Sequence, residues 1–428
     1  MRILLACEFY FPSVGGVQEV MRQVAERLVE RGHSVTVATS YLPERQNREL
    51  NGVTIAEFAV TGNLVRGLSG DIDAYRRYVL QGDYDVFMVK AAQQWTFDAL
   101  VPVLDRMSKP KVFIPCGFSA LYEPAYAAYY REMPDALSKF DHLVFYAADY
   151  RDINMARSHG LSHFSVVPNG ASEREFAVPA DPDFRRRHEI GAEAFVILTV
   201  GTFTGGMKGH RELASAFALA PFDGRPAVLI LNGNVMPGPS QGGTRARLRA
   251  VVSYPRRVAR RLRRLWLRGN ALVSEAREPI ATLVARINRS APAKRAVIVD
   301  LSRAELVQAY LNSDLFVFAS NIEYSPLVLY EAAAAGLPFL TVPVGNATEI
   351  AEWTGGGLVC LAPQDERGYT RVDPAVLAER ISRLAGDPTL RAALGRAGRQ
   401  AWSQRFTWET IADKYETIFA DLVGQPRA

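Results

Sequence analysis

Residues 2–39 read RILLACEFYFPSVGGVQEVMRQVAERLVERGHSVTVAT. An apolar run at 2–7 leads into a loop that ends in Gly15-Gly16, and a second apolar run occupies 34–39. The segment between them repeats apolar residues at helical spacing, namely Val17, Val20, Val24 and Leu28. Gly32 supplies a signal that ends such a helix. This order of strand, glycine loop, helix and strand predicts a βαβ unit in a parallel sheet covered by helices.

Similar apolar runs recur in two series along the rest of the chain. The first series continues with predicted strands at 86–89, 112–114, 142–146 and 165–167. The second series comprises predicted strands at 195–200, 227–231, 296–299, 314–319, 339–342 and 357–360. A connector rich in proline and aspartate, 178–182, separates the two series, and 407–422 predicts a terminal helix. The sequence therefore predicts an α/β fold with two doubly wound domains that face each other across a cleft.

The composition is that of a globular chain. Its length of 428 residues suits more than one domain, and 48% apolar with 22% charged residues excludes a disordered chain. Three widely spaced cysteines without a CxxC pair argue against a disulfide framework, and the six histidines show no metal-binding spacing. The start resembles no signal peptide, and no run of about 18 apolar residues exists to span a membrane. We therefore expect a cytoplasmic protein without a bound metal.

The net charge of +5 is concentrated in one stretch. Residues 241–270 contain ten arginines and no acidic residue, so the rest of the chain carries a net charge of −5. Apolar residues recur between these arginines at helical spacing, which predicts a basic amphipathic helix on each side of Pro255. Such a helix favours an anionic membrane surface, although it could instead pack on its own domain with its arginines in solvent. Nucleic acid would also attract it, but aromatic residues do not alternate with the arginines and no reading motif is present, so the sequence gives that interpretation less support.

Two glycine loops follow predicted strands and could approach a phosphate. Gly15-Gly16 stands between a strand and a helix, where free N–H groups and the helix dipole favour an anion. The loop 201–209, GTFTGGMKG, carries Lys208 but departs from a P-loop because Met207 precedes the lysine and no Ser or Thr follows it. Loops at this edge of an open sheet are where ligands bind. A tight turn without a ligand, or a surface lysine, would give the same pattern.

The most informative stretch is residues 323–338, EYSPLVLYEAAAAGLP. Ser325 is a plausible N-cap, Pro326 suits a first helical position, and Gly336 suits a left-handed stop. Glu323 then lies on the loop before the helix and Glu331 lies within it. Both carboxylates could line one pocket, with the helix N-terminus between them directed at a phosphate. Carboxylates accept hydrogen bonds from paired sugar or ribose hydroxyls, but two solvated glutamates would show the same spacing.

Taken together, these motifs resemble the GT-B-fold retaining glycosyltransferases of family 4 (glycosyl transferases group 1), over nearly the whole chain. The segments that carry the resemblance are Gly15-Gly16, 167–170 (VPNG), Val200-Gly201 with Lys208-Gly209, the pair Glu323 and Glu331, 336–338 (GLP), 345–350 (GNATEI) and 406–408 (FTW). The chain departs from the family at Thr202, where arginine is usual, at Cys116-Gly117, where His-Gly is usual, and at Tyr324-Ser325, where Gly-Phe is usual. Weaker phosphate neutralisation without that arginine could mean lower activity, an unusual donor, or compensation by another cation such as Lys90. The resemblance implies two Rossmann-like domains and a C-terminal helix that crosses back to the first.

The resemblance also implies roles for individual residues. Glu323 and Lys208 would be the catalytic residues, with Glu323 on hydroxyls of the transferred sugar and Lys208 on the diphosphate. The remaining implied residues bind the donor and are Gly15, Gly16, Thr202, Ser325, Pro326, Leu327, Val328, Glu331 and Asp300. Glu331 would bind the ribose, and backbone near Asp300 would meet the base. No metal and no cofactor are expected beyond a nucleoside-diphosphate sugar as co-substrate.

The implied domains are 1–172 with the terminal helix 407–428, which would bind the acceptor, and 173–406, which would bind the donor. A basic insertion would occupy about 236–294. The implied activity is a metal-independent, retaining transfer of a hexose-type sugar to an acceptor hydroxyl, in the synthesis of cell-envelope or other surface glycans. A lipid-linked acceptor would agree with an arginine block on the inner face of a membrane. Two alternatives stay open, a sugar-nucleotide epimerase with the same fold and a degenerate protein that binds nucleotide sugar or membrane without turnover.

Overall fold

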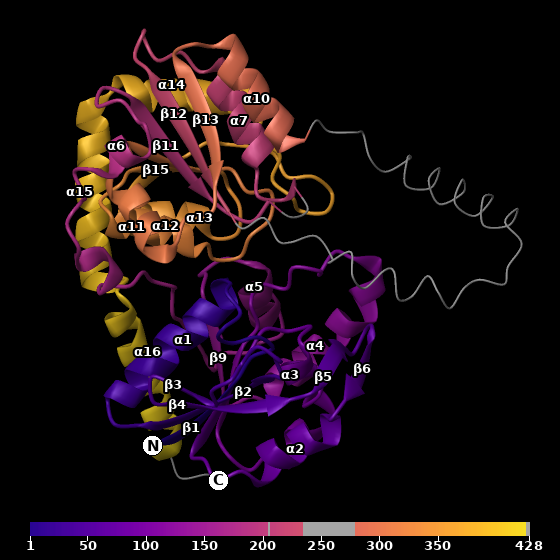
Figure 1. Ribbon diagram of the computed structural model, residues 1–428. Helices are drawn as coiled ribbons and strands as arrows, with labels where there is room; N and C mark the ends of the chain where they lie inside the picture. Colours follow the sequence, from indigo (N-terminus) through magenta and orange to yellow (C-terminus); the bar gives the residue numbers. More distant parts are fainter. Residues whose placement is uncertain (204–205, 234–278, 425–428) are drawn as a thin grey trace, which may run out of the picture.

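The computed structural model describes residues 1–203, 206–233 and 279–424. These residues form two large sheets of mainly parallel strands, each with its own helices (Figure 1). A cavity lies between the two halves. The strands of the first sheet lie between residues 2 and 166, and those of the second lie between 195 and 359. The predicted α/β fold with two doubly wound domains is thereby confirmed. The predicted domain limits at 172 and 406 stay predictions.

The first sheet has eight strands in the order β10-β9-β8-β7-β1-β2-β4-β3. Its strands are β1 Arg2–Ala6, β2 Ser34–Ser40, β3 Glu49–Leu50, β4 Val53–Phe58, β7 Val86–Lys90, β8 Lys111–Ile114, β9 His142–Phe145 and β10 Phe164–Val166. All neighbours are parallel except β3 and β4. From β1 the chain builds outward on one side and then returns to build on the other, so the strand order reverses between β1 and β7. Such a reversal leaves a crevice at the carboxyl ends of the strands.

Alternate residues of each strand explain how helices cover both faces of this sheet. Ile3 and Leu5 of β1 face α1 (Gly16–Glu30) and α16 (Trp408–Gly424). Leu4 and Ala6 face the opposite side, which four other helices cover. These helices are α2 Ile72–Gln81, α3 Trp95–Asp98, α4 Ala127–Ser138 and α5 Arg151–Ser158. The continuous apolar run that predicted β1 therefore reflects a strand that is buried on both faces.

The sequence pattern did not reveal the region between β2 and β7. There, β4 extends the sheet, and an antiparallel hairpin forms from β5 (Val60–Asn63) and β6 (Gly67–Gly70). The hairpin is rich in glycine and half exposed, so its apolar alternation is weak. A side chain at Gly62 would place its Cβ 1.9 Å from the carbonyl oxygen of Gly67, and Gly62 has a φ of +88°. Close pairing of the two strands therefore requires glycine at that position.

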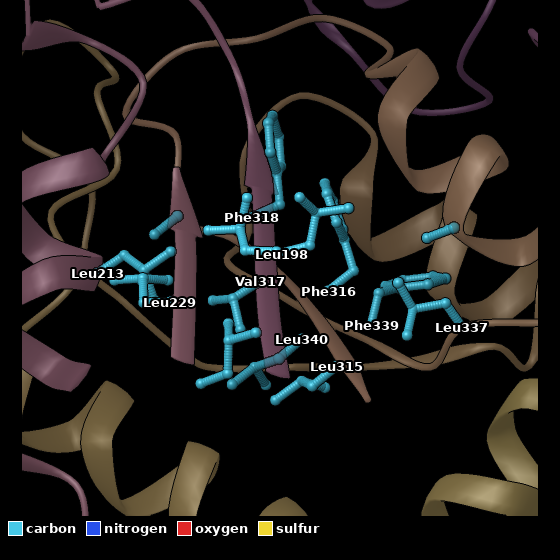
Figure 2. Packing of buried hydrophobic residues seen from close by; sticks show 14 of the residues in the cluster. Leu198, Leu213, Leu229, Leu315, Phe316, Val317, Phe318, Leu337, Phe339 and Leu340 are labelled. Atoms are coloured by element: carbon cyan, nitrogen blue, oxygen red, sulfur yellow. The ribbon is translucent and has the colours of Figure 1, made fainter. Parts of the chain in front are cut away.

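The second sheet has six parallel strands in the order β13-β12-β11-β14-β15-β16. Its strands are β11 Phe195–Val200, β12 Ala227–Asn232, β13 Lys294–Val299, β14 Leu315–Phe318, β15 Phe339–Thr341 and β16 Gly357–Val359. Figure 2 shows how Leu198, Leu229 and Phe316 from neighbouring strands gather into one apolar cluster. The strand order reverses between β11 and β14, so this sheet has its own crevice at the carboxyl ends of those two strands.

The helices of the second half fall into two contacting groups. One group contains α7 (His210–Leu219), α10 (Ile280–Ser290) and α14 (Pro374–Gly386). The other contains α12 (Leu327–Ala334), α13 (Ala347–Thr354) and α15 (Pro388–Arg405). The short helices α6 (Phe184–Arg187) and α11 (Arg303–Leu311) complete this half. The two groups are the covering layers that parallel strands require when each connection crosses back over the sheet.

Helix α10 lies inside the stretch that the sequence assigned to a basic insertion. Its Leu283, Val284 and Ile287 are buried in the core, and it contacts α7 and β13. It is therefore the crossover helix that joins the parallel strands β12 and β13. The arginine block at 241–270 and the helices predicted around Pro255 lie outside the described residues.

The last helix returns to the first half of the molecule. In Figure 1, α15 runs along the second half and α16 continues beside α1. Trp408, Ile411 and Tyr415 of α16 are buried in the core of the first sheet. The guanidinium of Arg31, at the end of α1, forms ion pairs with Glu409, Asp413 and Glu416 of α16, at 2.5, 2.5 and 2.7 Å. The predicted crossing of the C-terminal helix is thus confirmed.

None of the helices within the described ranges combines the length and apolar character that crossing a bilayer demands.

Candidate functional site

The carboxyl ends of both sheets open onto one cavity of about 470 Å³. Its walls come from loops after β1, β7, β8 and β9 in the first half, and from loops after β11 and β14 in the second. All the site residues predicted from the sequence line this cavity except Asp300; they are Gly15, Gly16, Thr202, Lys208, Glu323, Ser325, Pro326, Leu327, Val328 and Glu331. The two crevices at the points of strand reversal therefore form one shared site.

Lys208 and Glu323 form an ion pair within this site, although 115 positions separate them in the chain. Gly209 has a φ of +68°, and a Cβ there would lie 1.7 Å from the carbonyl oxygen of Ala319. The backbone N–H of Asn321 also donates to the carbonyl oxygen of Met207 at 2.8 Å. Glycine thus lets the two loops approach closely enough to bring the ammonium to the carboxylate. Both side chains are partly exposed to the cavity, at 29% and 21%.

Glu331 is held by two partners at the back of the site. Its Oε1 lies 2.7 Å from a guanidinium nitrogen of Arg303, and its Oε2 accepts a hydrogen bond from the Tyr310 hydroxyl at 2.9 Å. Arg303 also pairs with Glu175 at 2.7 Å, so its guanidinium bridges two carboxylates. Burial, followed by the charge of Glu331, raises the pKa of Tyr310 well above its usual range, so the phenol stays a donor. The Glu331 carboxylate is consequently fixed in orientation, with lone pairs left for a ligand.

The N-terminus of α12 differs by one residue from the prediction. Pro326 occupies the N-cap position with an extended backbone, and no side chain caps the helix, so the predicted cap at Ser325 is wrong. Proline lacks an N–H, and therefore Leu327 and Val328 provide the first-turn amides that have no acceptor within the helix. The carbonyl oxygen of Ser325 accepts a hydrogen bond from the side-chain amide of Asn169 at 3.1 Å.

Gly16 lies directly across the cavity from this helix end. A Cβ on Gly16 would lie 3.9 Å from Cδ1 of Leu327, so the two halves are within van der Waals reach there. The N-termini of α1 and α12 thus meet at the same point of the cavity, from opposite halves of the molecule. Because the N-termini of both helices carry partial positive charge, an anion between them would be stabilised from both sides.

The first half contributes a buried lysine to the wall. Lys90 is 1% exposed, ends β7, and places its ammonium 4.9 Å from the centre of the Tyr146 ring. Burial lowers the pKa of Lys90 to about 8. The neighbouring thiols do not neutralise it, because burial raises the pKa of Cys7 to about 12 and that of Cys116 to about 11. Lys90 therefore stays mostly charged near pH 7.

The backbone around Lys90 adopts conformations that non-glycine residues rarely adopt. Ala91 and Gln93 follow β7 with φ values of +73° and +64°, and Cys116 and Phe118 follow β8 with +63° and +51°. Each such residue costs free energy, of order 1–3 kcal/mol, unless the surroundings impose it. Strain of this kind gathers at functional edges of a fold, and here it flanks the cavity.

Tyr324 joins the two halves beside the site. Its hydroxyl accepts a hydrogen bond from the backbone N–H of Tyr146 at 2.9 Å, and it also bonds the buried carboxyl of Asp152. The rings of Tyr146 and Tyr324 stack with centres 5.5 Å apart. Asn346 strengthens the junction, because its side-chain amide donates to the carbonyl oxygen of Tyr146 at 2.9 Å. These contacts make the wall of the cavity continuous from Lys90 to Tyr324.

A wider hollow of about 1130 Å³ lies between the halves on the other side of this junction. Tyr150 lines it and donates a hydrogen bond from its hydroxyl to the backbone carbonyl oxygen of Glu323 at 2.9 Å. Its rim is mainly acidic, with Asp149, Glu349 and Asp365 among its residues. The hollow therefore adjoins the loop that carries Glu323 without containing the predicted site residues.

The structure also shows what the sequence did not indicate. Asp300 is exposed at the end of β13 and is not among the residues that line the cavity, so its role stays a prediction. Arg303 and Tyr146 line the cavity without having been singled out, and Asn169, quoted only as part of the motif at 167–170, lines it as well. Lys90, which the sequence offers as a cation that could replace the arginine missing at Thr202, does line the cavity, at the carboxyl end of a buried strand. Among the described residues, no cluster of three or more His, Cys, Asp or Glu could hold a metal ion.

Two family models match the chain, one in each half of the molecule. Residues 14–174 match the family described as Glycosyltransferase Family 4, and residues 288–401 match Glycosyl transferases group 1. Among curated proteins, the glycogen synthase of Mycobacterium tuberculosis is 34% identical over 119 residues, which cover 28% of this chain and 27% of that protein. The match thus spans about a quarter of the length of that relative.

Solved structures resemble the whole chain. Sucrose-phosphate synthase from Thermosynechococcus elongatus has a TM-score of 0.71 at 19% identity, with 98% of each chain covered. Anabaena HepE, solved in complex with UDP and glucose, has a TM-score of 0.68 at 17% identity, with 98% of this chain and 100% of that one covered. At these identities the likeness shows the fold alone.

Proposed function

Because the chain belongs to the GT-B glycosyltransferases of the family 4 and group 1 type, we propose that it transfers a hexose-type sugar from a nucleoside-diphosphate sugar to an acceptor hydroxyl. The observation that carries this proposal is the convergence of Lys208, Glu323, Glu331 and the N-terminus of α12 on one cavity. These groups provide a cation, two carboxylates and free amides, which are what a diphosphate, a sugar and a ribose require.

The donor is proposed to lie across the reversal point of the second sheet. Glu331 accepts hydrogen bonds from the two ribose hydroxyls, because Arg303 and Tyr310 fix the direction of its carboxylate. The diphosphate lies between Gly16 and the first-turn amides of Leu327 and Val328. The proposal receives support from Anabaena HepE, whose structure contains UDP and glucose.

Transfer is proposed to occur with retention of configuration and without a metal ion. As the bond between the sugar and the diphosphate breaks, negative charge grows on the leaving phosphate oxygens. Lys208 and the helix amides are already aimed at the cavity, and such preorganised groups stabilise developing charge without reorganisation. Glu323 accepts hydrogen bonds from the hydroxyls of the transferred sugar, and its ion pair with Lys208 holds both side chains in position.

The acceptor is proposed to enter from the wide hollow beside Tyr150. That hollow adjoins the loop of Glu323, and its carboxylates suit the hydroxyls of a glycan. The glycogen synthase match supports a glycan acceptor in general terms. We propose a surface or cell-envelope glycan, free or lipid-linked, as the class of acceptor.

From its sequence, the arginine block at 241–270 is proposed to contact an anionic membrane rather than nucleic acid, which would locate a cytoplasmic enzyme on the inner face of the membrane. Flotation with neutral and with anionic vesicles tests this. The wild type should float only with anionic vesicles, and a variant with these arginines changed to glutamine should float with neither. Flotation that ignores lipid charge would contradict the membrane role.

The activity is tested first by thermal unfolding in the presence of UDP-, GDP- and ADP-sugars, since a bound ligand raises the unfolding temperature. The donor so identified is then incubated with candidate glycan acceptors, and the anomeric signal of the product reports retention or inversion. Glu323→Ala should abolish transfer, whereas Glu379→Ala, on the exposed side of α14 in the same half, should not. A chelator should leave the rate unchanged.

Failure of every nucleoside diphosphate to bind at millimolar concentration would overturn the proposal. Binding with conversion of the donor into another nucleotide sugar, and no transfer, would indicate an epimerase instead. Unchanged transfer by Glu323→Ala would overturn the assignment of this carboxylate.

A further inference from the structure

Six charged side chains line the cavity, and one of the cations has no carboxylate partner in the described parts of the chain. The charged lining residues are Lys90, Lys208, Arg303, Glu19, Glu323 and Glu331. Lys208 pairs with Glu323, and Arg303 pairs with Glu331. Glu19 pairs at 2.8 Å with Arg22, which lies outside the lining. Lys90 is the one charged lining residue for which the described parts of the chain provide no carboxylate partner.

This imbalance matters because Lys90 is almost completely buried. Moving an ammonium out of water is costly unless an anion or several hydrogen bonds replace its hydration. The groups that face Lys90 are the Cys7 thiol after β1, the Cys116 thiol after β8 and the Tyr146 ring after β9. Both thiols are neutral near pH 7, and the phenol is neutral because burial keeps its pKa well above the usual range. The face of an aromatic ring attracts a cation but does not neutralise it.

The geometry points to the missing anion being a ligand. We propose that Lys90 binds the diphosphate of the nucleotide sugar from the side of the first domain, opposite Lys208. This inference rests on the proposed function, and it adds a binding residue that the first half contributes. Lys90 lines the same cavity as Gly16 and the N-terminus of α12, and the stacked rings of Tyr146 and Tyr324 connect its position with the residue before Ser325.

A diphosphate is the ligand group that best matches this arrangement. It carries more than one negative charge, whereas Lys208 is already shared with the Glu323 carboxylate. A second cation without a carboxylate partner supplies the attraction that the paired groups lack. The long side chain of lysine allows its ammonium to leave the Tyr146 ring for a phosphate oxygen when the ligand enters. A diphosphate bound by both lysines would also hold the two halves of the molecule together.

The test compares ligands that differ only in phosphate. Wild type, Lys90→Met, Lys111→Met and Glu331→Ala are titrated with a nucleoside diphosphate and with the matching nucleoside. Lys111 is the matched control, because it is a buried lysine on the adjacent strand β8 that already pairs with Asp141 at 3.5 Å. Lys90→Met should weaken diphosphate binding about 10- to 100-fold, as loss of one charge-assisted contact does, and leave nucleoside binding unchanged. Lys111→Met should change neither.

A second variant guards against an effect on folding. Lys90→Arg retains a cation whose pKa is far above neutrality, so it should restore much of the diphosphate affinity that Lys90→Met loses. Diphosphate affinity within twofold of wild type in Lys90→Met would overturn the inference, as would an effect confined to the Michaelis constant of the acceptor. If Glu331→Ala weakens binding and Lys90→Met does not, the proposed function stands and this inference fails. If wild type binds no nucleoside diphosphate, the proposed function fails instead.

Discussion

The two walls of the cavity are built on different electrostatic principles. The wall from the second half consists of paired charges, Lys208 with Glu323 and Arg303 with Glu331. The wall from the first half consists of glycine backbone, the Cys116 thiol, the Tyr146 ring, Glu19 paired with Arg22, and Lys90, which has no carboxylate partner in the described parts of the chain. Both walls stand at equivalent points of doubly wound sheets, since each follows the strands where the order reverses.

The difference shows how equivalent positions in two similar folds divide one task. Paired side chains hold each other in place before a ligand arrives, so the second wall is preorganised. An unpaired buried cation is unfavourable in the empty protein, and only a ligand relieves it. At the first wall, ligand binding is therefore favoured because an anion compensates the charge of Lys90. At the second wall, it is favoured because the ion pairs already hold the binding groups in place. Four changes test this contrast, and they follow in order of decreasing expected effect.

Removing the cation of the paired wall should have the largest effect. Lys208→Met deletes the ammonium and leaves Glu323 without its ion-pair partner. The turnover number should fall about 10²- to 10³-fold, as loss of one preorganised group at a developing charge does. Steady-state kinetics at saturating donor measures it. Lys139→Met is the control, since that lysine pairs with Asp105 at 3.0 Å away from the cavity. A fall of less than tenfold would mean that Lys208 does not face the leaving group.

Removing the buried carboxylate should weaken donor binding next. Glu331→Ala should raise the dissociation constant of the nucleoside diphosphate about 10- to 100-fold, because two hydroxyl contacts are lost. Nucleoside alone should lose affinity equally, which separates Glu331 from Lys90. Calorimetric titration measures both ligands. Glu305→Ala serves as the control, because this partly exposed glutamate of α11 pairs with Arg187 outside the cavity. If Lys90→Met and Glu331→Ala lost the same affinity for the nucleoside, the proposed division of roles between Lys90 and Glu331 would be wrong.

Removing the Lys90 ammonium from the first-half wall should change the stability of the protein. Lys90→Met should stabilise the empty protein at pH 7 by about 1–3 kcal/mol, because it removes a buried charge without a carboxylate partner. Burial lowers the pKa of Lys90 from its ordinary value of 10.5 to about 8 in the folded state, so the unfolded state binds more protons there between pH 8 and 10.5. The contribution of Lys90 to the free energy of unfolding of the wild type should therefore become more favourable as the pH rises from 8 to 10.5.

Unfolding curves from pH 7 to 10.5 measure this effect. The gap between Lys90→Met and wild type should be widest at pH 7 and should close toward pH 10.5. Lys111→Met, which breaks an ion pair, should instead destabilise the protein at pH 7. A Lys90→Met protein less stable than wild type at pH 7 would indicate a structural role for the ammonium.

The junction between the walls should show the smallest effect. Tyr324→Phe removes the hydroxyl that accepts from the Tyr146 N–H and bonds Asp152, but retains the stacked ring. The free energy of unfolding should fall by about 1 kcal/mol. Chemical denaturation measures the loss, with Tyr122→Phe, on an exposed tyrosine, as the control. Donor affinity should change little, and a large change would show that the junction also orders the N-terminus of α12.

Local sequence patterns predicted the elements well where each element buries a complete face. The strand at 195–200 coincides with β11, and the strand at 34–39 differs from β2 by one residue, because continuous apolar runs are typical of strands buried on both sides. Gly336 was predicted as a left-handed helix stop and has a φ of +67°. The hairpin β5–β6 was missed, since its glycines and half-exposed faces leave no clear alternation.

The predicted site was recovered except where it depended on contacts between distant segments. Glu323 and Glu331 were recognised because eight positions along one loop and helix bring them to one cavity. The cap of α12 was misplaced by one residue, because the backbone of Ser325 is held by Asn169 from 156 positions away. The sequence indicated Lys90 only as a possible replacement for the arginine missing at Thr202. Its burial, and its lack of a carboxylate partner among the described residues, depend on every segment that packs around it.

The sequence by itself determined the two doubly wound sheets, the glycine loops at their reversal points and the residue types offered to a ligand. These follow from period, capping and close backbone approach, which act over a few residues. Only the tertiary structure decided which charges pair, that Lys90 is buried without a carboxylate partner among the residues described, and that the N-termini of α1 and α12 meet across the cleft. Pairing and burial depend on distances between segments far apart in the chain, and those distances exist only once both sheets have folded and α16 has joined them.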